Sequence, residues 1–335
     1  LYAAERAQSL NKSLGCDLYV DGVFKSAQFE KYVTGRGIAW PRTDTGRLDL
    51  SDGTLKDLEK GRPDIAMIRA TRGTISNLRQ AMWPTGPDNR GRGRLSPFGT
   101  VTSRNKLSSK LHVFGASAWM RSFIRAEPGT VLIYTDWSSQ EKAVSAALSR
   151  DQRSLDAYVG GDVYVAFARD AGLIPPEGSK ATHAAERDIA KVVCLGADYG
   201  MGPQTLAARI GQQTIHAREL QKQHRRNYRE LWEWSDQVVE SGLSGVPLVT
   251  GFGWPLAAHI YNKERTLRNF LIQATAADMM RVAACLLVEA GIRVLLPVHD
   301  AFLIEADAGE ACAVQKQTEE IMEEASRIVL RNRVT

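Results

Sequence analysis

An aspartate inside an apolar hairpin constrains this chain more than any other feature of its sequence. In the stretch RVLLPVHDAFLIEAD, the apolar run from Val294 to Ile304 predicts a strand or a hairpin, yet His299 and Asp300 interrupt its centre. Asp is a poor strand former and is seldom buried unless it is paired or bound to a metal. Because Asp also favours turns, these residues alone leave two interpretations open, a hairpin turn and a metal or catalytic site.

A second aspartate stands where the first could find a partner. Asp136 follows the β-branched run in GTVLIYTDWS, which predicts a strand that ends in polar residues. If this strand and the hairpin are neighbours in one sheet, Asp136 and Asp300 meet across 164 residues of sequence. Paired carboxylates can hold two Mg²⁺ ions about 4 Å apart, which stabilise the attacking and leaving oxygens of a phosphoryl transfer. Since Mg²⁺ prefers oxygen ligands, the pair predicts a two-magnesium site.

A helical stripe in RDIAKVVCLGADYG indicates which phosphoryl transfer this is. Arg187, Lys191, Leu195 and Tyr199 recur every four residues and therefore lie along one face of the predicted helix. An ordinary amphipathic helix would place its cations opposite its apolar residues, whereas here they share a face. Two cations followed by an apolar and an aromatic side chain fit a nucleoside triphosphate that lies along the helix.

A second polar stripe lies in ERTLRNFLIQATAADMM, where Arg265, Asn269 and Gln273 again fall at intervals of four. All three side chains donate hydrogen bonds. The minor groove of DNA offers acceptors that hardly distinguish one base pair from another. Donors directed there would test the geometry of a base pair without reading its identity, as a copying enzyme requires, although polar helix faces are also common.

The order of the predicted elements indicates an α+β fold, in which a helical insertion interrupts a sheet. Apolar residues recur at helical spacing after Asp136 and again near the C-terminus. The stretch VPLVTGFGWPL predicts a separate hairpin. The predicted segments are 1–80 mostly helical, 81–130 loops and short strands, 155–240 mostly helical, 263–290 a long helix, and 308–331 a terminal helix.

Composition restricts the class of protein and its partners. The chain has 335 residues, 44% hydrophobic and 24% charged, as is typical of globular proteins. Its net charge of +5 is mild, but the tract from Trp83 to Arg125 carries eight cations against the single acid Asp88. Such a tract suits a phosphate backbone, although a solvated basic loop has the same composition. The eight are Arg90, Arg92, Arg94, Arg104, Lys106, Lys110, Arg121 and Arg125.

The remaining sequence signals predict an intracellular protein, cytoplasmic if the source is a bacterium or a phage. Four scattered cysteines fit neither a zinc motif nor a disulfide framework, so we expect reduced thiols. No signal peptide is visible at the start. The most apolar segment, RVAACLLVEAGIRVLL, is broken by Glu289 and Arg293, so we expect no membrane span.

Four motifs in this order resemble those of family A DNA polymerases, the DNA polymerase I-like enzymes. They are DWSSQE, RDIAKVVCLGADYG, ERTLRNFLIQATAAD and VHDAF. The segment GRLS at 93–96 resembles the template–primer segment of the family, and residues before it resemble the end of the family's thumb. The resemblance implies a right-hand fold with an antiparallel-sheet palm. Its parts are a partial helical thumb 1–83, palm 84–150 and 246–335, and helical fingers 151–245.

The resemblance also implies a role for each motif residue in DNA-directed DNA synthesis, as used in DNA replication and repair. Two Mg²⁺ ions, with Mn²⁺ as an alternative, would be held by Asp136, Asp300 and the main-chain carbonyl of Trp137. Lys191 would bind the dNTP and protonate the leaving pyrophosphate, and Glu141 would exclude a ribose 2′-OH. The other implied dNTP contacts are Arg187, Leu195 and Tyr199. The implied contacts to primer–template DNA are Arg94, Arg265, Asn269, Gln273 and His299.

The chain departs from the family pattern at several motif positions. Leu195 replaces an aromatic residue, Ala143 replaces an Arg, and Ala301 replaces a Glu. Ser139 and Gln140 replace the Gln and Ile that in the family usually precede the glutamate found here at Glu141. These changes concern sugar discrimination, primer handling and fidelity, since no metal-binding Asp and no triphosphate-binding cation is lost.

Three other functions share part of this pattern. A single-subunit RNA polymerase also carries a VHD motif, but it needs a small residue where this chain has Glu141. A metal-dependent nuclease could use Asp136 and Asp300, but it would not need the stripe that begins at Arg187. A catalytically degenerate DNA-binding scaffold would not need to retain these acids and cations. We therefore predict a DNA polymerase, without a proofreading site in this chain.

Overall fold

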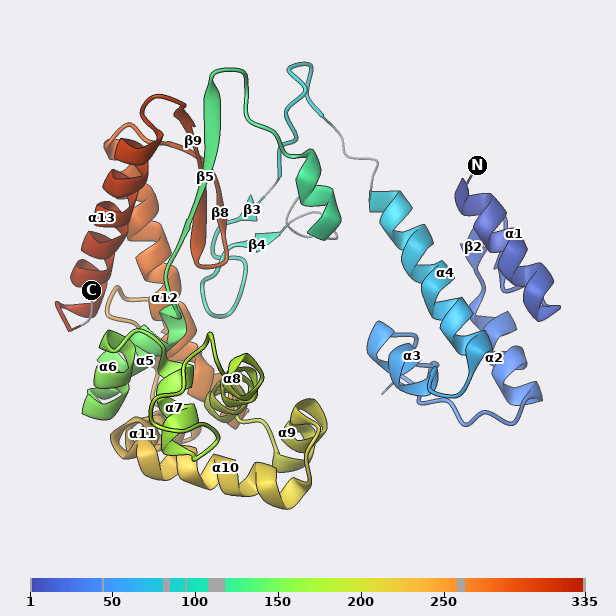
Figure 1. The fold of residues 1–335 in the computed structure, drawn as a ribbon, viewed down its shortest axis with the longest axis horizontal. Coiled ribbons are helices and arrows are strands. Elements are labelled where there is room, and N and C mark those ends of the chain that lie inside the picture. Colours follow the sequence, from blue (N-terminus) through green and yellow to red (C-terminus); the bar gives the residue numbers. More distant parts are fainter. Residues whose placement is uncertain are drawn as a thin grey trace. The chain divides into compact units, whose positions relative to one another are not determined.

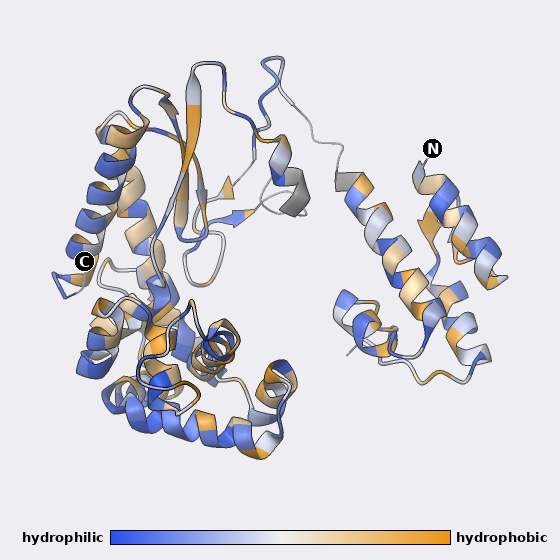
Figure 2. Cartoon of the chain, viewed as in Figure 1, coloured by the Kyte–Doolittle hydropathy of each residue, from blue (hydrophilic) through white to orange (hydrophobic). Residues whose placement is uncertain are grey.

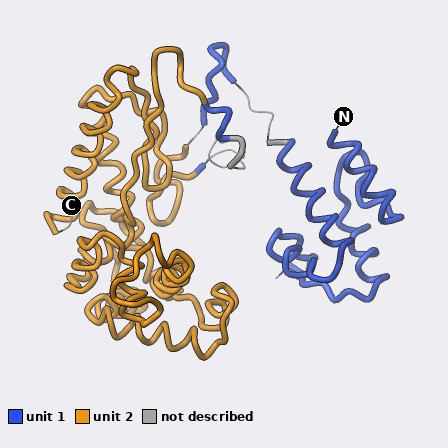
Figure 3. Tube along the Cα trace, viewed as in Figure 1, with its two compact units in different colours: residues 1–94, 107–124 blue, residues 95–106, 125–335 orange. Residues whose placement is uncertain are grey.

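The computed structural model describes two compact units, and each is treated by itself. The described residues are 2–43, 45–80, 85–93, 95–107, 118–257 and 263–333. One unit comprises Leu1–Arg94 with Leu107–Ile124, and the other comprises Leu95–Lys106 with Arg125–Thr335 (Figure 1 and Figure 3). Every predicted site residue except Arg94 belongs to the described part of the second unit.

The first unit is helical, with one small core. Phe29, Ile65 and Ile68 are fully buried at its centre, and the Phe29 ring meets the Trp40 ring edge-on at 4.7 Å. Ser51 begins the third helix by accepting a hydrogen bond from the N–H of Thr54. The elements are α1 (Tyr2–Leu14), β1 (Tyr19–Val20), β2 (Val23–Phe24), α2 (Ser26–Gly35), α3 (Asp52–Leu58), α4 (Pro63–Gln80) and the 3₁₀ helix η2 (Ala118–Phe123).

The second unit is built on a three-stranded antiparallel sheet of order β5-β9-β8. Strand β5 (Thr130–Asp136) pairs along its whole length with β9 (Ala301–Asp307), which forms a hairpin with β8 (Arg293–Val298). Helices α12 (Glu264–Glu289) and α13 (Ala311–Leu330) lie along this sheet (Figure 1). Their buried side chains form one cluster with those of the sheet, which fixes the position of both strand ends that carry an Asp.

A helical insertion separates β5 from the hairpin. Its buried centre includes Phe167, Val193 and Leu206. Two aspartates begin helices by accepting main-chain N–H groups, Asp151 from Ser154 and Asp162 from Tyr164 and Val165. The helices are α5 (Gln140–Ser149), α6 (Gln152–Val159), α7 (Val163–Asp170), α8 (Ala184–Asp198), α9 (Pro203–Ile210), α10 (Thr214–Asn227) and α11 (Arg229–Leu243).

Two short two-stranded sheets complete the unit. The strands β6 (Leu248–Val249) and β7 (Pro255–Leu256) form the hairpin predicted from VPLVTGFGWPL. The strands β3 (Leu95–Ser96) and β4 (Lys106–Leu107) pair within the basic tract. Within the described residues the order of helices and strands agrees with the predicted α+β fold, while the division into thumb, palm and fingers stays a prediction.

Helix α12 differs from the expectation about membranes in one respect. By length and composition alone it could cross a membrane, because Glu289 ends the helix and Arg293 lies outside it. Half of its most apolar window is buried, however, and its side chains pack against α5, α11, α13 and β8. In Figure 2, α12 carries more hydrophobic colour than α10, which is largely hydrophilic. The pattern is that of a core helix.

Candidate active site

The end of the central sheet brings Asp136 and Asp300 onto neighbouring chain segments. Asp136 is the last residue of β5 and pairs with Ala301. The main-chain N–H of Trp137 donates a hydrogen bond of 3.1 Å to the main-chain oxygen of Asp300. His299 and Asp300 are the two residues between β8 and β9, and His299 has a left-handed φ of 54°. The HD pair is therefore a hairpin turn, and this turn delivers Asp300 beside the end of β5.

The two carboxylates are available for a cation. Asp136 is exposed and Asp300 half-buried, and among the described ion pairs neither side chain takes part. No group of three or more His, Cys, Asp or Glu side chains suited to a metal occurs in the described ranges. The local donors are thus two carboxylates and main-chain oxygens, a set that fits Mg²⁺ rather than a metal that needs His or Cys.

The Trp137 side chain anchors the segment that follows Asp136. Its indole Nε1 donates a hydrogen bond of 2.9 Å to Ser326 Oγ on α13, and its ring meets the Phe302 ring at 6.2 Å. Ser326 in turn donates to the Met322 carbonyl at 3.0 Å. Because the indole is held by the terminal helix, the main chain of Trp137 stays beside Asp300. This support from α13 was not predicted from the sequence.

Helix α8 carries the predicted cations, and both lie over one buried ring. The Arg187 guanidinium lies 5.2 Å and the Lys191 ammonium 5.7 Å from the centre of the Tyr164 ring. Arg187 Nε also donates a hydrogen bond of 2.7 Å to Asp162 Oδ2. Burial of the Asp162 carboxylate opposes its charge, but Arg187 and two main-chain N–H groups outweigh this effect and lower the pKa of Asp162. Sequence reasoning missed both Asp162 and Tyr164.

The apolar half of the predicted stripe takes two different positions. Leu195 is half-buried and packs against the core of the helical insertion. Tyr199 is the residue that caps the C-terminal end of α8, where its N–H donates to the Leu195 carbonyl at 3.0 Å. The cations therefore lie within α8, while the aromatic side chain stands at its end.

The two polar stripes meet at a pocket of about 430 Å³. Tyr199 of the first stripe lines it together with all three donors of the second, which lie on the N-terminal half of α12. Within this pocket the Asn269 amide donates 2.8 Å to the carbonyl of Arg265 in its own helix. Two loop residues that the sequence did not single out complete the wall. The lining is Val101, Thr102, Tyr199, Arg265, Thr266, Asn269 and Gln273.

Glu141 stands in the first turn of α5, and Arg104 binds it. An Arg104 guanidinium nitrogen forms an ion pair with Glu141 Oε1, and the two side chains are 38% and 24% exposed. Arg104 is one of the eight cations of the basic tract, for which the sequence leaves a phosphate backbone and a solvated loop both open. Arg94, the other predicted contact from that tract, lies outside the described residues.

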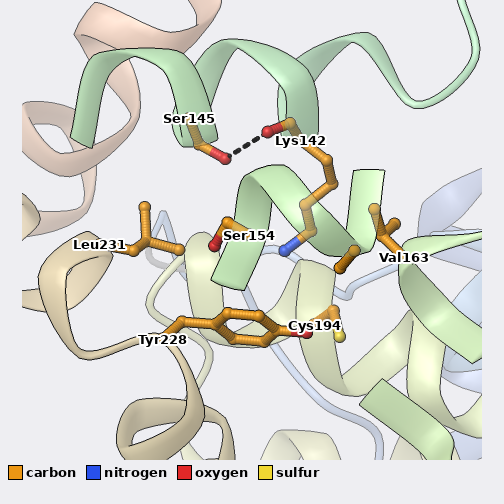
Figure 4. A pocket seen from close by; sticks show the side chains of 8 residues that line it. Lys142, Ser145, Ser154, Val163, Cys194, Tyr228 and Leu231 are labelled. Carbon is orange, nitrogen blue, oxygen red and sulfur yellow. Dashed lines mark hydrogen bonds between the residues drawn. The ribbon is translucent and has the colours of Figure 1, made fainter. Parts of the chain in front are cut away.

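A buried ion pair joins the residue after Glu141 to the end of α8. Lys142 pairs with Asp198, and the two side chains are only 11% and 13% exposed. Burial opposes the charge of Lys142, but Asp198 more than offsets this and raises the pKa of Lys142. Figure 4 shows the Lys142 side chain extending into a small cavity of about 20 Å³. Burial also raises the pKa of the Cys194 thiol in the wall of this cavity to about 12, so the thiol stays protonated.

The comparisons with known sequences agree on one family. The sequence model of DNA polymerase family A matches residues 114–334, about two thirds of the chain. The thermostable DNA polymerase I of Thermus aquaticus is 27% identical over 305 residues, which are 83% of this chain and 36% of that protein. The DNA polymerase of Mycobacterium phage L5 is 26% identical over 301 residues, 86% of this chain and 48% of that protein. The chain thus spans less than half the length of either relative.

A solved structure gives the same fold. The POL domain of Pol1 from M. smegmatis, in complex with DNA primer–template and dNTP, superposes with a TM-score of 0.78. The match covers 96% of this chain and 61% of that one, at 22% sequence identity. This similarity extends over the mostly helical architecture with its small antiparallel sheets, and confirms the predicted fold class.

Proposed function

This chain belongs to DNA polymerase family A, and on that basis we propose that it is a template-directed DNA polymerase, which adds dNTPs to the 3′-OH of a primer. The observation that carries the proposal is the pocket shared by Tyr199 and the α12 donors Arg265, Asn269 and Gln273. A nuclease needs the acids of the sheet but has no use for a nucleotide-binding helix that ends beside minor-groove donors.

The acids at the sheet end would hold the metal ions. Asp136, Asp300 and the main-chain carbonyl of Trp137 supply the oxygen ligands that two Mg²⁺ ions prefer, with Mn²⁺ as an alternative. When bound, the ions would stabilise negative charge on the attacking and leaving oxygens. We propose that His299, which is exposed in the same hairpin turn, contacts the primer end.

Helix α8 would bind the triphosphate. Arg187 and Lys191 are one helical turn apart over the Tyr164 ring, so their charges can meet successive phosphates. We propose that Lys191 Nζ also donates a proton to the leaving pyrophosphate. Glu141 would exclude the 2′-OH of a ribonucleotide, and Tyr199 would lie beside the templating base.

Primer extension tests this proposal most directly. A labelled primer on a defined template is incubated with each dNTP or rNTP, with and without Mg²⁺. We expect Mg²⁺-dependent addition of the dNTP complementary to the template. Preferential addition of rNTPs would support an RNA polymerase, degradation without synthesis a nuclease, and binding without either reaction a non-catalytic scaffold.

We further propose that this chain does not proofread. The only paired acids that the sequence and the described ranges assign to metal binding are Asp136 and Asp300. A mismatched primer incubated with contaminant-free protein, without dNTPs or pyrophosphate, should keep its length. Steady shortening from its 3′ end would contradict this part of the proposal.

A further inference from the structure

The ion pair between Arg104 and Glu141 assigns a role to a residue outside the four motifs and the GRLS segment. We infer that Arg104 is a positioning residue that determines sugar specificity, because it holds the Glu141 carboxylate in place against the incoming sugar. This inference rests on the proposed function, in which Glu141 excludes ribonucleotides. A side chain can exclude a hydroxyl group only if it cannot move aside, and Glu has three rotatable bonds to restrain.

The loop that carries Arg104 is itself fixed. The Trp254 indole donates a hydrogen bond of 3.2 Å to the Val101 carbonyl, and its ring stacks on Phe98 at 5.1 Å. Arg281 of α12 donates 2.8 Å to the Ser103 carbonyl. Ser103 is fully buried and has a left-handed φ of 57°, so the chain turns sharply just before Arg104. Arg104 therefore extends from an anchored loop rather than from a free one.

The main chain of Glu141 is fixed from the other side. Glu141 lies in the first turn of α5, where the helix dipole favours an acid, and the next residue, Lys142, forms the buried ion pair with Asp198 at the end of α8. Leu195, which stands where the family has an aromatic residue, packs instead with the core of the insertion. Leu195 has no aromatic ring with which to restrain the Glu141 side chain. Arg104 supplies this restraint instead.

The position of the loop links this restraint to the bound nucleotide. Val101 and Thr102, three and two residues before Arg104, line the same pocket as Tyr199 and the donors of α12. The loop therefore contacts the pocket at one point and the glutamate at another. The competing role for Arg104 is a DNA phosphate contact, as its place in the basic tract first indicated. The two roles differ in what they predict for dNTPs and rNTPs.

Steady-state incorporation of one dNTP and the matching rNTP on a fixed primer–template separates these roles. The variants are Arg104→Ala, Arg104→Lys, Glu141→Gly and the double variant Arg104→Ala/Glu141→Gly. Packing against a fixed wall rejects an added hydroxyl by about 10²-fold, so a loosened glutamate should raise the relative rNTP efficiency about tenfold. We expect that rise for Arg104→Ala and a smaller one for Arg104→Lys. The double variant should match Glu141→Gly alone, because Arg104 acts through the glutamate.

Each failure has its own signature. If Glu141→Gly raises rNTP use but Arg104→Ala leaves the ratio unchanged, the proposed polymerase stands and the role of Arg104 is wrong. Equal losses for dNTP and rNTP in Arg104→Ala, with weaker primer–template binding by fluorescence anisotropy, would identify a phosphate contact instead. Arg125→Ala removes the same charge from the same tract and should leave the ratio unchanged. If Glu141→Gly leaves the ratio of rNTP to dNTP efficiency unchanged, Glu141 does not exclude ribonucleotides. That part of the proposed function is then wrong, and the role of Arg104 is wrong with it.

Discussion

The acidic end of the central sheet and helix α8 differ in whether their charged side chains form ion pairs. At the sheet end, Asp136 and Asp300 have no cationic partner among the described ion pairs. Along α8, Arg187 is paired with Asp162, and Asp198 with Lys142. Acids without a cationic partner keep their oxygens open to a cation, whereas removing one partner of a buried ion pair destabilises the fold. Loss of a sheet acid should therefore lower activity, whereas loss of a charge partner of α8 should lower stability.

The largest effect is expected from the sheet acids. Asp136→Ala or Asp300→Ala should lower primer extension by at least about 10³-fold. A site that cannot hold both metal ions would lose several kcal/mol of charge stabilisation in the transition state. DNA binding should survive, since it depends on contacts from Arg and Lys to phosphates. Single-turnover extension and anisotropy measure the two properties.

Asp307→Ala provides the matched control for this prediction. Asp307 lies in the same strand as Ala301 but at the opposite end of the sheet, paired with Thr130 in the register. It should retain extension, because no part of the site depends on it. Near-normal extension by the Asp136 or Asp300 variant would exclude the two-metal assignment.

Loss of the Lys142 charge should chiefly affect stability. Lys142→Ala leaves Asp198 buried without its partner, so the free energy of unfolding in urea should fall by about 3–5 kcal/mol. The double variant Lys142→Leu/Asp198→Leu removes both charges and should recover most of that loss. An equal loss in the double variant would show that packing, rather than the buried charge, is what Lys142 contributes.

Lys191 differs from Arg187 because it lies over the Tyr164 ring without an ion pair to an acid among the described residues. Lys191→Ala should lower the maximal single-turnover rate about 10²-fold, with weaker dNTP binding as a second effect, because the ammonium acts where charge develops. Lys316→Ala, on the exposed face of α13, is the charge-matched control. An unchanged maximal rate would argue against proton donation to the leaving group.

The smallest effect is expected at Asp162. Asp162→Asn keeps a capping side chain at the start of α7 but removes the charge that Arg187 now neutralises, so dNTP affinity should rise about threefold. Pre-steady-state titration of the dNTP measures it. Weaker binding would mean that Asp162 orients Arg187 instead of competing with phosphate. Since the pKa of Asp162 lies below 3.8, the stability from this pair is present above that pH and is lost only as the pH falls through the lowered pKa.

Local pattern was enough to predict the strands, the helices and the two stripes, since each depends on residues within one turn or one strand of each other. The proximity of Asp136 and Asp300 could also be predicted, because a carboxylate in an apolar hairpin is unfavourable unless it serves a turn or binds a cation. The ion partners did not follow. Arg104 and Glu141 are 37 residues apart, and Arg187 and Asp162 are 25 apart. A basic residue in a basic tract carries no sign of which acid it will meet, so the sequence predicts only that the tract as a whole suits phosphate or solvent.

The pairing of β5 with β9 has a consequence for how the protein folds. The register joins Thr130 to Asp307 and Asp136 to Ala301, so the whole helical insertion must be enclosed before the sheet can close. Closing a flexible loop of that length costs about 4–5 kcal/mol of chain entropy, whereas the helices of the insertion form largely local contacts. We expect the insertion to gain hydrogen-exchange protection first and β5 to join the preformed β8-β9 hairpin late. The two acids of the proposed metal site would then be brought together by one of the last steps of folding, after helix α8 has already formed.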